Sequence, residues 1–145
     1  MKEIRTEITI KAPREKVWKT FTNAESYAQW NPFIKSLTGN LKVAEQITVL
    51  LQPPGGNVMT FRPKVLVFEE NKEFRWLGKL FFKGLFDGEH YFQFKDNQDG
   101  STTFVHGEKF TGILVPLFAG ILVKTEKGFQ LMNEALKEQV EKSGV

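Results

Sequence analysis

Two histidines and one glutamate are the residues of this sequence whose types and spacing favour chemistry. The chain's two histidines, His90 and His106, each lie among phenylalanines, in the stretches GEHYFQF and FVHGEKF, and Glu108 follows two residues after His106. An imidazole with a carboxylate can anchor a polar group of a ligand, move protons as a general acid or base, or bind zinc. The same residues can also form a purely structural pair, because a buried carboxylate needs a partner. All four roles stay open.

Strand geometry brings the three side chains together. Side chains alternate between the two faces of a strand, so residues 85–95 place Phe86, Gly88, His90, Phe92 and Phe94 on one face. Residues 102–111 place Phe104, His106, Glu108 and Phe110 on one face in the same way. The sequence NQDG between the two stretches predicts a tight turn, and the resulting antiparallel register sets His90 opposite Glu108 and Phe92 opposite His106. We therefore predict that His90, His106 and Glu108 face inward together.

We expect neither a metal ion nor any other cofactor at this cluster. No second carboxylate is available to orient the imidazoles, and the aromatic surroundings do not suit an exchangeable water. The chain has no cysteine, which excludes disulfides, thiolate metal sites and cysteine nucleophiles. If the protein is an enzyme, His90, His106 and Glu108 are the candidates for proton transfer without a metal.

The pattern of the whole chain predicts an α+β fold with one curved antiparallel sheet of about seven strands. Alternation over residues 4–10 predicts a first strand, Pro13 begins a helix, and a second short helix over residues 25–30 ends before Pro32. Further strands are predicted at residues 34–37, 47–52, 59–69, 72–78, 85–95 and 102–111. After Pro116 the apolar period becomes helical, which predicts a long C-terminal helix that carries Phe118, Leu122, Thr125, Phe129, Met132, Leu136 and Val140 on one stripe.

Several segments, in this order, resemble the START-like or Bet v 1-like helix-grip superfamily (SRPBCC), in its polyketide cyclase/dehydrase and lipid-transport branch. They are ITIKAPREKVWKTFTNAESYAQWNPF, FRWLG, GEHYFQF with STTFVHGEKFTG, and KGFQLMNEAL. The resemblance covers essentially the whole chain and implies a deep apolar cavity between the sheet and the last helix. Members of the superfamily include binders, carriers and cyclases, so the resemblance does not imply one reaction.

The side chains predicted to face this cavity are mostly aromatic. We expect Trp30, Phe33, Phe61, Trp76, Phe86, His90, Phe92, His106, Glu108, Phe110, Phe118, Leu122 and Phe129 to bind the ligand. The leading hypothesis is a binder or carrier of a small, largely apolar molecule, such as a lipid, an isoprenoid or an aromatic polyketide-like compound. The alternative is an enzyme of the cyclase or dehydratase kind.

Length and composition narrow the classes of protein to which this chain can belong. A chain of 145 residues predicts one domain over residues 1–145, and a formal net charge of +3 without a basic run argues against nucleic acid. No apolar run resembles a signal peptide or is long enough for a membrane span, so we expect a cytoplasmic protein. For Leu80, Phe81 and Phe82 in the segment KLFFKGLF we expect one of three roles. They form a lid over the cavity, extend the neighbouring strands, or make transient contact with a membrane surface.

Overall fold

The predicted α+β helix-grip fold is confirmed. The computed structural model describes residues 2–80 and 84–142, with the backbone alone at Leu80 and Ala119. The helical elements are α1 (Arg14–Thr22), a 3₁₀ turn (Ala24–Ser26), α2 (Tyr27–Trp30), a second 3₁₀ turn (Val115–Phe118) and α3 (Ala119–Lys142). The strands are β1 (Lys2–Ile10), β2 (Ile34–Thr38), β3 (Thr48–Leu51), β4 (Met59–Phe61), β5 (Lys64–Glu69), β6 (Glu73–Leu80), β7 (Phe86–Asp96) and β8 (Thr102–Thr111).

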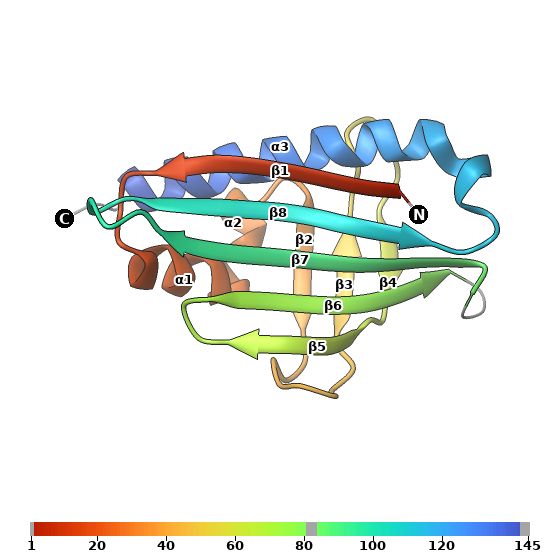
Figure 1. Cartoon of the computed structure of the whole chain (residues 1–145), viewed down its shortest axis with the longest axis horizontal. Coiled ribbons are helices and arrows are strands. Elements are labelled where there is room, and N and C mark those ends of the chain that lie inside the picture. The colour runs from red at the N-terminus through yellow and green to blue at the C-terminus, as the bar shows by residue number, and fades with distance from the viewer. Residues whose placement is uncertain (1, 81–83, 143–145) are drawn as a thin grey trace.

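The strands form two antiparallel sheets rather than one. The larger sheet has the order β1-β8-β7-β6-β5, and the smaller has the order β2-β3-β4. Figure 1 shows the smaller sheet running across one face of the larger one, with α3 along the same side near β1 and with α1 and α2 at one end. The two sheets, α1, α2 and α3 therefore enclose the space that the larger sheet faces.

The expected strand over residues 59–69 is wrong, because Pro63 divides it. Proline has no backbone N–H to donate to a ladder. Residues before it form β4, which pairs with β3, whereas residues after it form β5, which pairs with β6. The Pro63 carbonyl accepts the N–H of Ile47 at 3.0 Å, close to the bridge between Gln46 and Lys64. Residues 2–80 and 84–142 therefore form eight strands instead of the predicted seven or so.

The predicted hairpin at residues 85–111 is confirmed, including its register. His90 lies opposite Glu108, Phe92 opposite His106, and Phe94 opposite Phe104. The turn residues Gln98 and Gly100 both have positive φ, which the sequence NQDG accommodates. The alternation of the two strands therefore points all three polar candidates toward the interior.

The long C-terminal helix is confirmed, with its apolar stripe turned inward. Phe129, Met132, Leu136 and Val140 are fully buried. Phe118, which was expected on the same helix, lies in the 3₁₀ turn just before it. At Gly128 an added Cβ would lie 2.6 Å from the ring of Phe33, so glycine is needed there for the helix to approach that ring.

Candidate ligand-binding cavity

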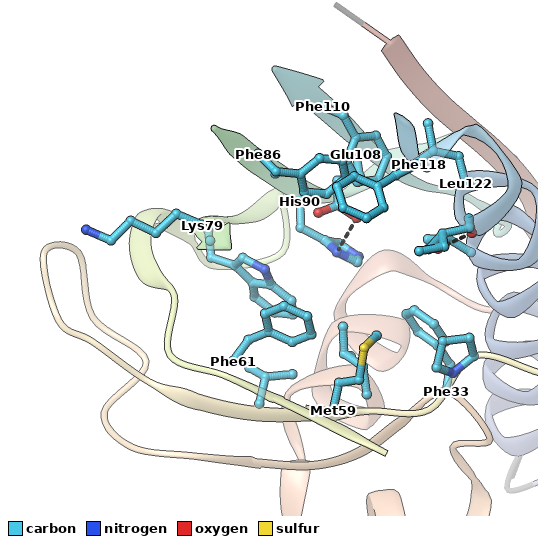
Figure 2. Close-up of a pocket in the computed structure, with 18 residues that line it drawn as sticks. Phe33, Met59, Phe61, Lys79, Phe86, His90, Glu108, Phe110, Phe118 and Leu122 are labelled. Atoms are coloured by element: carbon cyan, nitrogen blue, oxygen red, sulfur yellow. Dashed lines mark hydrogen bonds and ion pairs between the residues drawn. The ribbon is translucent and has the colours of Figure 1, made fainter. Parts of the chain in front are cut away.

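The two halves of the larger sheet face different surroundings. Toward one end, Trp18 and Phe21 of α1 pack on the sheet, with ring centroids 4.7 Å apart for Phe21 and Phe92 and 5.0 Å apart for Trp18 and Phe94. Among the described residues no such helix covers the other end, where the inner faces of β6, β7 and β8 border a cavity of about 140 Å³. The smaller sheet and the beginning of α3 form the opposite wall of this cavity (Figure 2).

Nine of the thirteen side chains predicted to face a cavity lie along this one. They are Phe33, Phe61, Trp76, Phe86, His90, Glu108, Phe110, Phe118 and Leu122. Residues that were not predicted to bind the ligand complete the wall, among them Val49, Leu51, Met59, Gly78, Gly88 and Ile121. Val49, Leu51 and Met59 belong to the smaller sheet, and nothing in their local pattern tells which part of the larger sheet that sheet will cover.

The other four predicted residues do not border the cavity. Trp30 packs edge-on against Tyr27, with ring centroids 5.3 Å apart, and its indole N–H donates to Ser26. Phe92, His106 and Phe129 are completely buried behind the cavity wall, where the His106 and Phe129 rings stack with centroids 4.0 Å apart. Phe92, His106 and Phe129 therefore support the cavity wall from behind and do not form its surface.

One pair of side chains supplies the polar end of the cavity. Nδ1 of His90 and Oε1 of Glu108 are 3.4 Å apart, and the two side chains are 1% and 15% exposed, respectively. Figure 2 shows this pair beside the rings of Phe86, Phe110 and Phe118. Lys79 also borders the cavity, but its ammonium group extends away from it (Figure 2). A ligand in the cavity thus meets mostly apolar side chains, with Glu108, His90 and Thr125 as the polar ones whose functional groups are not directed away.

The second histidine connects this pair to the centre of the protein. Nε2 of His90 lies 2.7 Å from Nε2 of His106, and Nδ1 of His106 lies 2.9 Å from Oδ1 of Asn133. The amide of Asn133 donates to the hydroxyl of Thr6 at 2.8 Å. The sequence reasoning missed this role of Thr6 and Asn133. Their signal is a polar residue on the inner face of an otherwise apolar strand or helix stripe.

Burial makes the neutral forms of these titratable groups dominant near neutral pH. It lowers the pKa of His90 to about 3 and that of His106 well below its ordinary value, since a buried imidazolium loses its hydration. The nearby His90 also lowers the pKa of His106, whereas the hydrogen bond with Asn133 acts in the opposite direction. Burial raises the pKa of the Glu108 carboxyl to about 8.

The geometry of the cluster differs from that of a metal centre. The two Nε2 atoms point at each other across a hydrogen-bond distance, so they share a proton position and do not converge on a common ligand position. Among residues 2–80 and 84–142, no three His, Cys, Asp or Glu side chains are grouped so that they could hold a metal ion.

Comparison with known proteins places the chain in a family. The family described as polyketide cyclase / dehydrase and lipid transport matches residues 1–141, so the chain belongs to it. A search of curated proteins found no match.

Solved structures share the fold at low sequence identity. The Zhui aromatase/cyclase from Streptomyces sp. R1128 superimposes with a TM-score of 0.75 at 13% identity, over 97% of this chain and 94% of that one. A START superfamily protein from Mycobacterium smegmatis gives 0.71 at 20% identity, over 97% and 98% of the two chains. A norcoclaurine synthase from Thalictrum flavum gives 0.73 at 14% identity, over 99% and 96%. These likenesses confirm the predicted helix-grip fold.

The membrane predictions concern residues that are mostly not described. Phe81 and Phe82, proposed as a lid or a membrane contact, lie outside the described residues, as does the side chain of Leu80. Both roles stay predictions. Within the described part of the chain, each helix is too short or too polar to cross a membrane.

Proposed function

We propose that the protein binds one small, largely apolar molecule in the cavity, with the polar end of that molecule at Glu108. The observation that supports this most is the cavity itself, whose wall is largely apolar and carries the His90–Glu108 pair at its polar end. Ligand sites are typically apolar hollows with a few placed polar groups. A cavity of about 150 Å³ lined by aliphatic and aromatic side chains accepts a single benzene ring, and the cavity here is of similar size.

Toluene is a suitable first probe, followed by NMR of the backbone amides. We expect saturable shifts at cavity residues such as Val49 and Gly88. The variant Gly78→Leu should abolish them, because an added Cβ at Gly78 makes only ordinary contacts at 3.8 Å or more, so that the leucine side chain fills the cavity. The matched control is Thr60→Leu, at an exposed position of β4 between two residues that border the cavity.

Absence of saturable shifts with the wild-type protein would contradict the binding proposal, as would equal binding by wild type and Gly78→Leu. If toluene binds as expected, native mass spectrometry of protein purified without denaturation, with extraction of any co-purifying molecule, would identify the natural ligand. Its expected class is a lipid, an isoprenoid or an aromatic polyketide-like compound, of which a portion about the size of one ring would occupy the cavity.

A second candidate function is proton transfer on the bound molecule, of the kind that a cyclase or dehydratase needs. The chain of contacts from Glu108 through His90 to His106 favours it, because a proton taken up or released at Glu108 has two further nitrogen positions. Hydrogen–deuterium exchange at the methyl group of acetophenone tests it. Wild type should accelerate the exchange, and Glu108→Gln or His90→Ala should not. A wild-type rate equal to that of buffer would exclude this candidate and leave the binding proposal intact.

A further inference from the structure

Hydrogen bonds among Thr6, Asn133 and His106 close a ring behind the cavity, and this ring fixes how their polar groups are oriented. The hydroxyl of Thr6 lies 2.8 Å from the backbone carbonyl of His106. A carbonyl oxygen can only accept, so the Thr6 hydroxyl donates its single hydrogen there. Asn133, which is also 2.8 Å from this hydroxyl, must then donate to it through Nδ2. The carbonyl of His106 therefore determines which way the Asn133 amide points.

The orientation of Asn133 determines the tautomer of both histidines. Its Oδ1 is left facing Nδ1 of His106 at 2.9 Å, so this nitrogen carries a hydrogen. His106 is completely buried and neutral, hence its Nε2 has a free lone pair and accepts from Nε2–H of His90 at 2.7 Å. His90, which is neutral for the same reason, then has its own lone pair on Nδ1.

The proton of Glu108 is the group that this lone pair requires. Nδ1 of His90 is buried, has no hydrogen-bond partner among the described residues, and faces Oε1 of Glu108 at 3.4 Å. An ionised carboxylate would set negative oxygen against a lone pair, whereas a carboxylic acid can donate its O–H. Among residues 2–80 and 84–142, the neighbouring strands place no cation beside this carboxyl: β1 places Ile4 opposite Glu108, β7 contributes His90, and the ammonium of Lys79 on β6 is directed away.

The other carboxyl oxygen lies over a glycine on the cavity side. A Cβ at Gly88 would collide with Oε2 of Glu108, so the absence of a side chain there gives this oxygen its place. Gly88 and Glu108 both border the cavity. Within residues 2–80 and 84–142 no hydrogen bond is made to Oε2. A ligand therefore meets Oε2 as a carbonyl-like acceptor.

We propose that Glu108 is a neutral carboxylic acid whose proton is directed to His90 and whose Oε2 accepts a hydrogen bond from a hydroxyl group, so that the site selects apolar alcohols or phenols. This inference rests on the proposed binding function and names the chemical class of its ligand. An anionic ligand gains nothing here, because Oε2 has no hydrogen to donate. The raised pKa of Glu108, about 8, agrees with the neutral form near pH 7.

Three one-ring probes of similar size separate this inference from simple apolar binding: p-cresol, 4-methylanisole and toluene. Their dissociation constants are measured by NMR titration with wild type, Glu108→Leu and Glu108→Gln. In Glu108→Leu we expect p-cresol to bind about three- to tenfold more weakly, which is the loss of one neutral hydrogen bond. Toluene and 4-methylanisole should change by no more than about twofold, because neither can donate to Oε2.

Glu108→Gln is the decisive variant. Glutamine can donate from its amide to His90 and still offer its carbonyl to the ligand, so it should retain p-cresol binding within about twofold if Glu108 is a neutral acid. A loss as large as that of Glu108→Leu would overturn the inference, because it would mean that an ionised carboxylate holds the phenol. So would a carboxyl ¹³C signal of Glu108 that reports ionisation at pH 6. Failure of all three probes to bind wild type would instead contradict the binding proposal.

Discussion

The two ends of the larger sheet have the same alternation of large apolar side chains but enclose different interiors. At the end covered by α1, Phe21 is 1% exposed and packs against four other phenylalanines, which fill the space completely. At the other end, Phe86 and Phe110 face a cavity of about 140 Å³. The difference lies in what covers the sheet: a helix with bulky side chains in one half, and the more distant wall of the smaller sheet and α3 in the other.

The alternation along a sheet therefore sets which side chains point inward, but it does not set whether they pack against other side chains or face a cavity. His90 lies where the two regions meet, with its ring 4.7 Å from that of Phe92 on the packed side and 4.7 Å from that of Trp76 on the cavity side. The series of polar contacts from Asn133 through His106 and His90 to Glu108 therefore begins in the packed region and ends at the cavity.

The largest expected effect is a loss of folding stability when a phenylalanine ring is removed. One variant loses a ring at the packed end of the sheet, and a second variant loses a ring at the cavity end. Phe21→Ala should lower the free energy of unfolding by about 3–5 kcal/mol, because it opens a void among close-packed rings. Phe110→Ala should cost less, about 1.5–3 kcal/mol, because part of its surroundings is already empty. Urea unfolding of both variants measures the difference, and equal losses would mean that the two halves are packed alike.

The next effect concerns the polar pair at the cavity end. Glu108→Leu should cost about 1–3 kcal/mol, since it leaves Nδ1 of the buried His90 without a donor. The double variant with His90→Phe should recover only part of the loss, because Nε2 of His106 then loses its own donor. A double-mutant cycle measures the coupling, and we expect at least about 0.5 kcal/mol. Additive losses would show that His90 and Glu108 do not interact.

The smallest expected effect is a change of folding stability with pH that the titration of Glu108 causes. Its pKa of about 8 lies above that of an unfolded glutamate, so the folded state retains a proton that the unfolded state releases. This contribution is complete at low pH and is lost as the pH rises toward 8. The histidines, whose pKa values are lowered, act oppositely, and their contribution is lost as the pH falls below about 6.5.

Between about pH 6.5 and 8, therefore, only the Glu108 contribution changes among these three groups. The stability of wild type relative to Glu108→Gln should fall with rising pH there, by at most about 1.4 kcal/mol per pH unit. Urea unfolding of both proteins over this range measures the slope, and all groups other than Glu108 cancel in the difference. A flat difference would contradict a raised pKa.

Sequence reasoning predicted the parts of this arrangement that depend on local rules. Alternation along β7 and β8, with the turn at residues 97–100, was enough to set His90 opposite Glu108. It did not find Asn133, although this residue interrupts the apolar stripe of α3, because a polar residue on a helix usually faces solvent; the packing of α3 on β1 and β8 buries it. Trp30 was expected on the wall as one of many large apolar side chains, but a local hydrogen bond to Ser26 directs it elsewhere.

The hydrogen bond between Asn133 and Thr6 has a consequence for the order of folding. These residues stand 127 positions apart, and the bond from Thr6 to the His106 carbonyl spans 100 positions. Contacts of such separation carry a large loop-closure cost and form late. A nascent chain that lacks α3 would have the hairpin of β7 and β8 but not the amide of Asn133 that orients His106. On the binding proposal, competence to recognise a ligand would therefore arise only when the last helix docks on the first strand.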